Sequence, residues 1–217
     1  MNQLNKLDTA ATSQSGRGRP RDTEKNAAIV EAAACLFLEH GFDGTSMDEV
    51  AKRASVSKQT VYSHFSSKEQ LFSASIRAVI EQYYPDSVLE RVETHSLEAD
   101  LRVVCESYAH LLMSEEAMAM FRVLVAAAPK GPNLAQLFWN AGPQEMQDRL
   151  ESFLLSRTQK GELVIPDIAV ASNQIVCLLK GKTHFMRSIG LIDSISEDQI
   201  QRNVDNAVAA FLKLYRA

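Results

Sequence analysis

The sequence predicts an all-α protein built from two helical parts. Apolar residues recur at steps of three and four along most of the chain, as on one face of an α-helix. Serine and threonine stand where these stretches begin, and glycine or proline where they end. The longest strand-like alternation is the short fragment at 162–165. We therefore expect a three-helix N-terminal domain at 22–82, preceded by a flexible arm at 1–21, and a larger helical C-terminal domain at 83–217.

The composition is that of a globular protein and excludes several other classes. Of the 217 residues, 46% are hydrophobic and 23% charged, with 9 Gly and 6 Pro, which argues against collagen-like and disordered chains. The formal net charge of -4 argues against nucleic-acid binding through overall positive charge but not against a local basic patch. The N-terminus has no apolar signal segment, and Arg122 interrupts the richest apolar stretch. We expect a cytoplasmic protein that does not span a membrane.

The first predicted helix runs from Asp22 to His40. Its apolar residues follow the helical period, and Gly41 supplies a stop. Residues 1–16 are polar without a sustained period, so we expect them to form a flexible tail.

Two short helices should follow, joined by a tight turn. Ser46 and Glu49 have the spacing of a capping box at the start of the first, and Ser57 is a good N-cap for the second at 58–65. Ser67 then opens a long helix that ends before Pro85. In the remainder, the clearest helices are the last two, 168–189 and 197–215, of which the final one carries an apolar stripe opposite a polar face.

The two short helices have the layout of a helix-turn-helix at about 45–65 that reads DNA. On the second helix, Lys58 suits guanine acceptors, Gln59 an adenine edge and Thr60 a thymine methyl or a phosphate. The N-termini of these two helices and of the next one, at Thr45, Ser46, Ser57 and Ser67, suit phosphate oxygens. Tyr62, His64 and Lys68 lie where phosphates would run. On periodicity alone, the two helices are equally well explained as parts of a bundle.

Specific residues favour the DNA-binding interpretation. The segment 17–76 resembles the DNA-binding domain of the TetR family of transcriptional regulators, through Phe37-Leu38-Glu39-His40-Gly41-Phe42, Val50-Ala51-Lys52-Arg53-Ala54, Val61-Tyr62-Ser63-His64-Phe65 and Lys68-Glu69-Gln70-Leu71. The chain departs from the family at Ser55, where members often carry glycine at a turn that demands a left-handed backbone. The resemblance implies base and backbone contacts for Lys58, Gln59, Thr60 and Tyr62, and phosphate contacts for Thr45, Ser46, Ser57, His64 and Lys68. A surface role for His64 and packing of Tyr62 against the first helix are the alternatives.

The basic stretch Arg17, Arg19 and Arg21 carries three guanidiniums on a chain that glycine and proline keep slim and extended. Such an arm suits a narrow A·T minor groove. The alternative is a solvated tail attracted loosely to phosphates.

The C-terminal domain should dimerise and bind an effector. One helix-turn-helix reads few bases, so specific binding needs two copies, and the two apolar helices at the end of the chain are the best seam for a homodimer. The region 121–143 resembles the AefR-like subgroup, and the wider resemblance implies a small-molecule pocket in this domain. Candidate wall residues are Tyr108, Met118, Phe121, Leu124, Phe138, Trp139, Met146 and Phe185, with His110, Arg122 and His184 as candidate polar anchors; each is also explained as ordinary core or surface.

No enzyme motif has the required spacing. Gly181-Lys182-Thr183 imitates the end of a phosphate-binding loop, but Val176 stands where its earlier glycine is needed. The cysteines at 35, 105 and 177 match no metal, redox or disulfide pattern, and Cys105 and Cys177 are expected to be buried. We expect no enzyme, no metal and no cofactor. The sequence predicts a dimeric repressor that an effector releases from a palindromic operator on double-stranded DNA; an activator and an all-α protein-interaction module are the alternatives.

Overall fold

We analysed the chain in a computed structural model, which describes residues 19–85, 88, 96–131 and 133–217. The described residues are helical, as predicted, and the only β contact among them is a single bridge between Leu163 and Arg216. The helices are α1 (Arg19–Gly44), α2 (Met47–Arg53), α3 (Lys58–His64), α4 (Lys68–Tyr83), α6 (Leu97–Met113), α7 (Glu115–Ala127), α8 (Asn133–Ala141), α9 (Pro143–Gln159), α10 (Ile168–Ser188) and α11 (Glu197–Tyr215), with a short 3₁₀ turn η1 (Ala128–Lys130) after α7.

The predicted helix starts are confirmed where a serine caps them. Side-chain oxygens of Ser46, Ser57 and Ser67 accept backbone N–H groups in the first turns of α2, α3 and α4. Ser196, which was not predicted as a cap, caps α11 in the same way. Each cap satisfies a backbone donor that the helix itself leaves unpaired. Helix α1 differs from the prediction, because it begins at Arg19 rather than Asp22. Proline is compatible with the first turn of a helix, so Pro20 does not prevent the earlier start.

Two glycines interrupt long helices. Gly41 has φ 71, so regular helix stops there as predicted, although a further turn extends α1 to Gly44. Gly181 has φ 50 and breaks α10, which the sequence indicated as one continuous helix. The side-chain amide of Asn203 on α11 donates to the carbonyl oxygen of Leu179 just before this break. A side chain of the neighbouring helix α11 thus bonds to the backbone beside the break.

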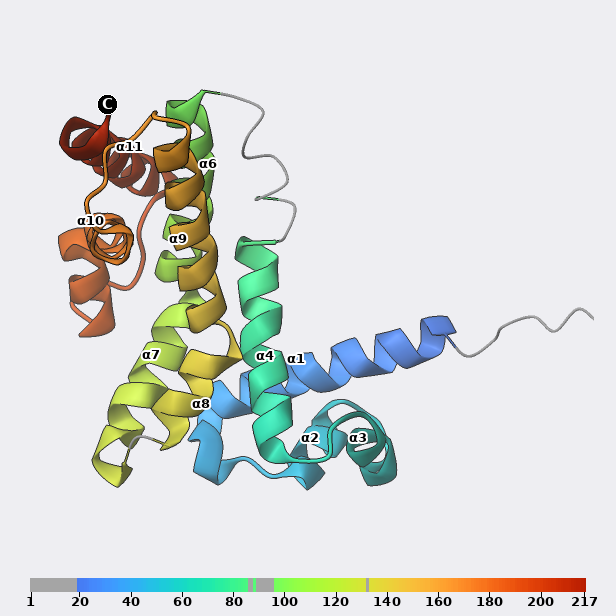
Figure 1. The fold of residues 1–217 in the computed structure, drawn as a ribbon. Helices are drawn as coiled ribbons and strands as arrows, with labels where there is room; N and C mark the ends of the chain where they lie inside the picture. Colours follow the sequence, from blue (N-terminus) through green and yellow to red (C-terminus); the bar gives the residue numbers. More distant parts are fainter. Residues whose placement is uncertain (1–18, 86–87, 89–95, 132) are drawn as a thin grey trace, which may run out of the picture.

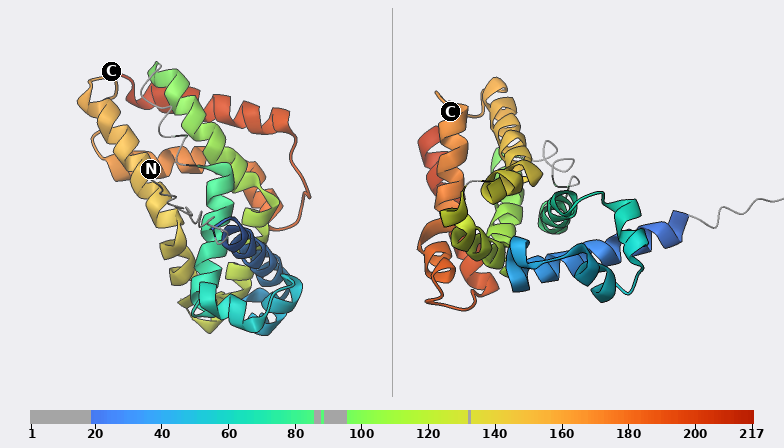
Figure 2. Two further views of the ribbon diagram at one scale, coloured as in Figure 1. Left: turned by 90° about the vertical axis from the view of Figure 1, so that its right-hand side faces the viewer. Right: turned by 90° about the horizontal axis from the view of Figure 1, so that it is seen from below.

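The helix-turn-helix and the last two helices lie at opposite ends of the molecule. Figure 1 shows α1, α2 and α3 at one end and α10 and α11 at the other, and the views of Figure 2 agree. One apolar cluster fills the helix-turn-helix end, with Ile29, Phe37, Val50, Val61 and Phe72 among its buried members. A second cluster lies between α6, α9, α10 and α11. None of the helices in the described ranges is long and apolar enough to cross a membrane.

Helix α4 connects the two clusters. Its first half contributes Leu71, Phe72 and Ile76 to the helix-turn-helix cluster, and its later residues Val79 and Tyr83 pack against the C-terminal cluster. The C-terminal part also contributes to the helix-turn-helix cluster, because Met120 on α7 and Ala141 on α8 are buried in it. A change in the packing of α7 or α8 therefore acts directly on the core that positions α2 and α3.

Candidate nucleic-acid interface and effector cavity

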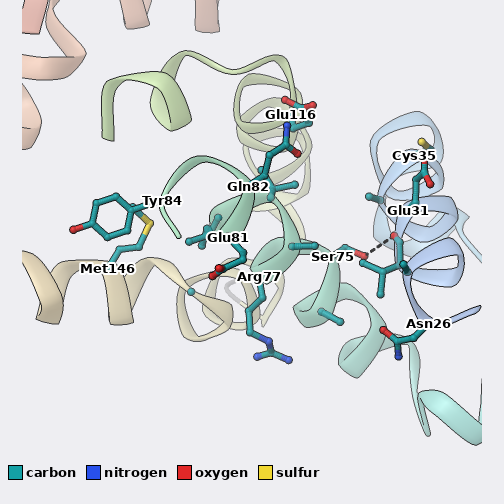
Figure 3. Close-up of a pocket in the computed structure, with 18 of the residues that line it drawn as sticks. Asn26, Glu31, Cys35, Ser75, Arg77, Glu81, Gln82, Tyr84, Glu116 and Met146 are labelled. Carbon is teal, nitrogen blue, oxygen red and sulfur yellow. Dashed lines mark hydrogen bonds between the residues drawn. The ribbon is translucent and has the colours of Figure 1, made fainter. Parts of the chain in front are cut away.

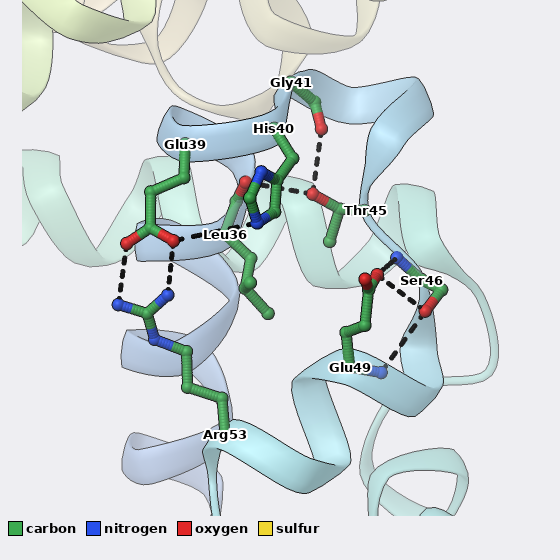
Figure 4. Close-up of polar contacts among 8 residues, drawn as sticks. All are labelled: Leu36, Glu39, His40, Gly41, Thr45, Ser46, Glu49 and Arg53. Carbon is green, nitrogen blue, oxygen red and sulfur yellow. Dashed lines mark hydrogen bonds and ion pairs between the residues drawn. The ribbon is translucent and has the colours of Figure 1, made fainter.

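The helix-turn-helix is built by local capping and a small shared core. Ser46 Oγ accepts the Glu49 backbone N–H at 3.2 Å, and Glu49 Oε2 accepts the Ser46 backbone N–H at 2.9 Å, which is the predicted capping box (Figure 4). Val61 on α3 is fully buried and Phe65, just after the helix, is nearly so; both belong to the apolar cluster that residues of α1, α2 and α4 also form. The core thereby determines which residues of α3 stay at the surface.

The turn between α2 and α3 contains the one left-handed residue, apart from glycines, in the part of the chain that the structure describes. Ser55 has φ 55, in the region that glycine adopts freely and that costs other residues of the order of 1 kcal/mol or more. The sequence indicated this conformation from the usual glycine of the family, and the structure has it. The turn keeps its shape although serine occupies it.

The exposed residues of α3 are those that suit DNA bases. Lys58, Gln59, Tyr62 and Ser63 are exposed, and 46% of Tyr62 is accessible. Lys58 Nζ lies 2.8 Å from Asp48 Oδ1 on α2 and 5.9 Å from the centre of the Tyr62 ring. The hydrogen bond to Asp48 raises the pKa of Lys58, so this ammonium stays charged. Both partners are exposed, which makes the ion pair weak and easily exchanged for a ligand.

A second ion pair fixes α2 against α1. Arg53 donates to both carboxylate oxygens of Glu39 at 2.6 and 2.7 Å (Figure 4). This bidentate geometry is the stronger form of the arginine–carboxylate contact. Two carboxylates near the helix-turn-helix, Glu39 and Asp48, are thus each matched by a cation.

Three of the residues predicted to contact phosphates have side chains that are bonded within the free protein. Thr45 is only 2% exposed, and its hydroxyl lies 3.0 Å from the Leu36 carbonyl oxygen and 2.8 Å from that of Gly41 (Figure 4). Lys68 Nζ donates to the carbonyl oxygens of Phe42 and Thr45 at 2.8 and 3.0 Å. These two side chains stabilise the connection between α1 and α2.

His64 is the third such residue. Its side chain is 12% exposed and lies against α1, with Nε2 3.2 Å from Asp22 Oδ1. Among the other candidates, Ser46 and Ser57 are exposed caps, and the Thr60 hydroxyl lies 2.8 Å from Ser57 Oγ at the start of α3. These three remain at the surface.

The predicted basic arm falls partly outside the described residues. Arg17 lies outside them, whereas Arg19 and Arg21 belong to the first turn of α1. The prediction of an extended arm is therefore corrected from Arg19 onward, because this part of the chain is helical.

A cavity of about 260 Å³ lies between α4, α6, α7, α8, α9 and α10. Seven of the eight predicted wall residues line it: Tyr108, Met118, Phe121, Leu124, Phe138, Trp139 and Met146. The eighth, Phe185, is 63% exposed and does not line it. Sequence reasoning missed Ile76, Val79 and Ile80 of α4, whose apolar period resembles that of any buried helix.

Of the three candidate polar anchors, one lines the cavity and two bond to residues outside it. His184 lines the cavity and meets the Phe121 ring edge to face at 5.8 Å between centroids. His110 instead pairs with Glu197 at 3.1 Å, and Arg122 donates to the Arg187 carbonyl oxygen. Lys180, which sequence reasoning also missed, lines the cavity as its cationic side chain.

A larger and more open groove of about 980 Å³ lies beside α1, α4 and α9 (Figure 3). It differs in character from the cavity, because the described residues of its lining include Glu31, Glu81, Glu116 and Glu145 but just two cations, Arg77 and Arg149. This excess of carboxylates is unfavourable for a polyanion.

The outer face of α10 and α11 exposes apolar side chains. Val170, Leu214 and Cys177 lie together around a shallow depression, and Val170 and Leu214 are 47% and 65% exposed. Cys177 was expected to be buried and is exposed, whereas Cys105 is buried as expected. The described residues hold no cluster of potential metal ligands.

Comparison with known proteins gives matches over both parts of the chain. Residues 29–75 match the family model of bacterial regulatory proteins of the tetR family, and residues 99–217 match that of the C-terminal domain of AefR-like transcriptional repressors. The uncharacterized HTH-type transcriptional regulator YdeS of Bacillus subtilis is 33% identical over 153 residues, which cover 69% of this chain and 73% of YdeS.

Solved structures give the same result. A TetR-family transcriptional regulator from Mesorhizobium loti MAFF303099 superposes with a TM-score of 0.76 and 29% identity, covering 92% of this chain and all of that one. The flavonoid-responsive regulator FrrA is 32% identical with a TM-score of 0.67, covering 89% of this chain and 98% of FrrA.

Proposed function

The chain belongs to the TetR family of transcriptional regulators, which are not enzymes, and from this we propose that it is a dimeric repressor released from a palindromic operator by a small-molecule effector. The match of its C-terminal part to AefR-like repressors supports the direction of regulation. Such a protein acts where the chromosome is, so we expect it in the cytoplasm.

The observation that carries the proposal is the exposed edge of α3. Lys58, Gln59 and Tyr62 project from a short helix whose opposite side, through Val61, is locked in the core. An α-helix fits the major groove, where Lys donates to guanine O6 and N7 and Gln pairs with adenine N6 and N7. We assign base contacts to Lys58 and Gln59, and backbone contacts to Ser46, Ser57, Thr60 and Tyr62. Arg17, two residues before α1, would add positive charge to this interface.

A homodimer is supported by the exposed apolar side chains of α10 and α11. A second copy that covers Val170, Cys177 and Leu214 would remove them from water, and the commonest homodimer is related by a two-fold axis. The helix-turn-helix lies at the other end of the molecule, so each copy presents its own α3 (Figure 1). Two such helices read half-sites roughly 34–36 Å apart, which is one turn of DNA.

The cavity supports effector control because its wall is shared with the helix-turn-helix core. Ile76 of α4 lines the cavity and is buried in the helix-turn-helix cluster, and Leu124 and Phe138 line the cavity and pack against the same cluster. A ligand that favours another packing of these side chains changes the position of α4 and hence of α2 and α3. Release requires that the effector bind this second state more tightly than the DNA-binding state. The response of FrrA to flavonoids supports a small organic effector.

Selection of binding sites from random duplex DNA tests the proposal. Purified protein at a stated salt concentration should enrich one palindrome with half-sites about one helical turn apart. Enrichment of a single half-site would contradict the dimer. No enrichment, also after denaturing the protein and refolding it to remove bound ligand, would contradict sequence-specific DNA binding and favour the protein-interaction module.

A further inference from the structure

We propose that the cavity binds a small apolar carboxylate, whose charge is held by Lys180 with His184 beside it. This proposal rests on the proposed function, because it names the chemical class of the effector. It depends on the walls of the cavity, on the one cationic side chain among the described residues that line it, and on the break in α10 beside this side chain.

The walls of the cavity are almost entirely apolar. Aliphatic side chains of α4, α6, α7 and α10 face aromatic ones of α7 and α8, and no Asp or Glu is among the described residues that line the cavity. Ligand pockets commonly range from about 300 to 1,000 Å³. At about 260 Å³, this cavity suits a single ring or a short chain rather than a long acyl group.

The neutral polar groups of the lining are largely occupied within the protein. The Tyr108 hydroxyl donates to the Met146 carbonyl oxygen at 2.7 Å. The Gln147 side-chain amide donates to Ser172 Oγ at 2.7 Å and to Glu151 Oε1 at 2.9 Å. Recognition of a polar ligand group therefore falls to Lys180 and His184.

Lys180 is the unmatched cation of this region. Arg187, three residues after His184, has a partner, because it pairs with Glu115. Lys180 Nζ has no hydrogen bond or ion pair with any residue that the structure describes, although the side chain is half-buried. A partly desolvated ammonium on an apolar wall favours an anion that supplies both charge and hydrogen-bond acceptors.

His184 adds a hydrogen bond rather than a second charge. Burial, with the positive charges of Lys180 and Arg187, lowers the pKa of His184, so the imidazole is neutral at neutral pH. A neutral imidazole keeps one N–H donor, and an anion bound between Lys180 and His184 would accept it.

The break at Gly181 fixes this pair in place. Asn203 donates to Leu179 just before the break, and a Cβ at position 181 would lie 3.3 Å from Asn203 Oδ1. In the segment after the break, His184 lies against the ring of Phe121, which also lines the cavity. Helix α10 is therefore shaped around the two polar groups of the cavity.

The intrinsic fluorescence of one residue can report binding in this cavity. Trp139 is the single tryptophan of the sequence and lines the cavity. Benzoate, phenylacetate and 4-phenylbutyrate, each compared with its neutral amide, are titrated while tryptophan fluorescence excited at 295 nm is recorded. The wild type should bind at least one acid about tenfold more tightly than its amide, since a hydrogen bond to a charged group contributes about 1.5–3 kcal/mol.

Lys180→Met should remove this preference while leaving amide binding unchanged, and Lys180→Arg should restore it in part. Lys182→Met removes an exposed lysine two residues away and should behave as the wild type. Equal binding of acid and amide by the wild type, or no fluorescence change with any acid, would overturn the proposal. The same holds if Lys180→Met keeps the preference.

Binding of the unliganded proteins to selected operator DNA separates this proposal from the proposed function. Specific DNA binding without acid preference overturns the carboxylate alone. Acid preference in a protein that binds no specific DNA overturns the repressor function and leaves the carboxylate site standing.

Discussion

Lys58 Nζ on α3 lies 2.8 Å from Asp48 Oδ1 on α2, so the lysine best placed to read a base is paired with a carboxylate in the free protein. Both side chains are more than half exposed, and the pair exchanges readily with solvent. Binding DNA would transfer the ammonium from Asp48 to the groove. If Lys58 contacts DNA as proposed, Asp48 would compete with DNA for this ammonium and would also repel the phosphates beside it.

Asp48→Asn should raise DNA affinity by roughly threefold to tenfold at low salt, with a smaller gain at high salt. The change in the free energy of unfolding should stay within about 0.5 kcal/mol, because the ion pair is exposed. Fluorescence anisotropy with labelled operator at two salt concentrations measures the effect. Asp198→Asn, an equally charge-neutralising change on α11, serves as the control and should leave affinity nearly unchanged. A weaker Asp48→Asn complex would mean that Asp48 orients Lys58 for binding.

Ser55→Gly should stabilise the protein by about 0.5–1 kcal/mol, because glycine adopts φ 55 without strain. Part of the gain is offset, since glycine also increases the conformational entropy of the unfolded chain. Urea unfolding measures the change. Ser152→Gly in the middle of α9 is the matched control and should destabilise by about 0.5 kcal/mol. Destabilisation of equal size at both positions would contradict strain at Ser55.

Val170→Glu combined with Leu214→Glu should prevent dimer formation, because it buries two carboxylates in the proposed seam. Light scattering after gel filtration should give the mass of one chain, and operator affinity should fall at least tenfold. Leu155→Glu changes an exposed leucine on α9 and should leave the dimer intact. A stable dimer in the double variant would place the interface elsewhere.

Stability should depend on pH through His184. Its pKa is lowered in the folded state, so the unfolded chain binds the proton more tightly, and acidification below the ordinary pKa of about 6.5 favours unfolding. The free energy of unfolding from urea titrations should therefore fall from pH 7.5 to pH 5.5, and His184→Gln should reduce this fall. His40, His64 and His110, which lie near carboxylates, are common to both proteins and cancel in the comparison. Identical pH profiles would show that His184 is as well solvated in the folded chain as in the unfolded one.

The features that the sequence predicted correctly are local ones. Ser46, Ser57 and Ser67 cap their helices because the cap and its partner are three residues apart, so the pattern contains both groups. The left-handed turn at Ser55 was indicated instead by the glycine that members of the family often carry there.

The features that the sequence did not indicate concern side chains whose partners are distant in the sequence. Lys68 contacts carbonyl oxygens of residues 42 and 45, and His64 contacts Asp22, so their direction depends on how α1 packs. Phe185 leaves the cavity and Lys180 lines it on the same helix, on either side of the break at Gly181. A periodic apolar pattern indicates that a helix is buried but does not show which cavity its side chains meet.

The most direct test of the account is the operator specificity of Lys58→Ala combined with Gln59→Ala. The variant and the wild type are compared by the ratio of affinities for the selected operator and for a scrambled duplex, at one salt concentration. We expect the ratio to fall by about a hundredfold or more, since each base contact discriminates by about 1–3 kcal/mol, while thermal stability is unchanged. A variant that keeps the wild-type ratio would show that α3 does not read the operator through these side chains.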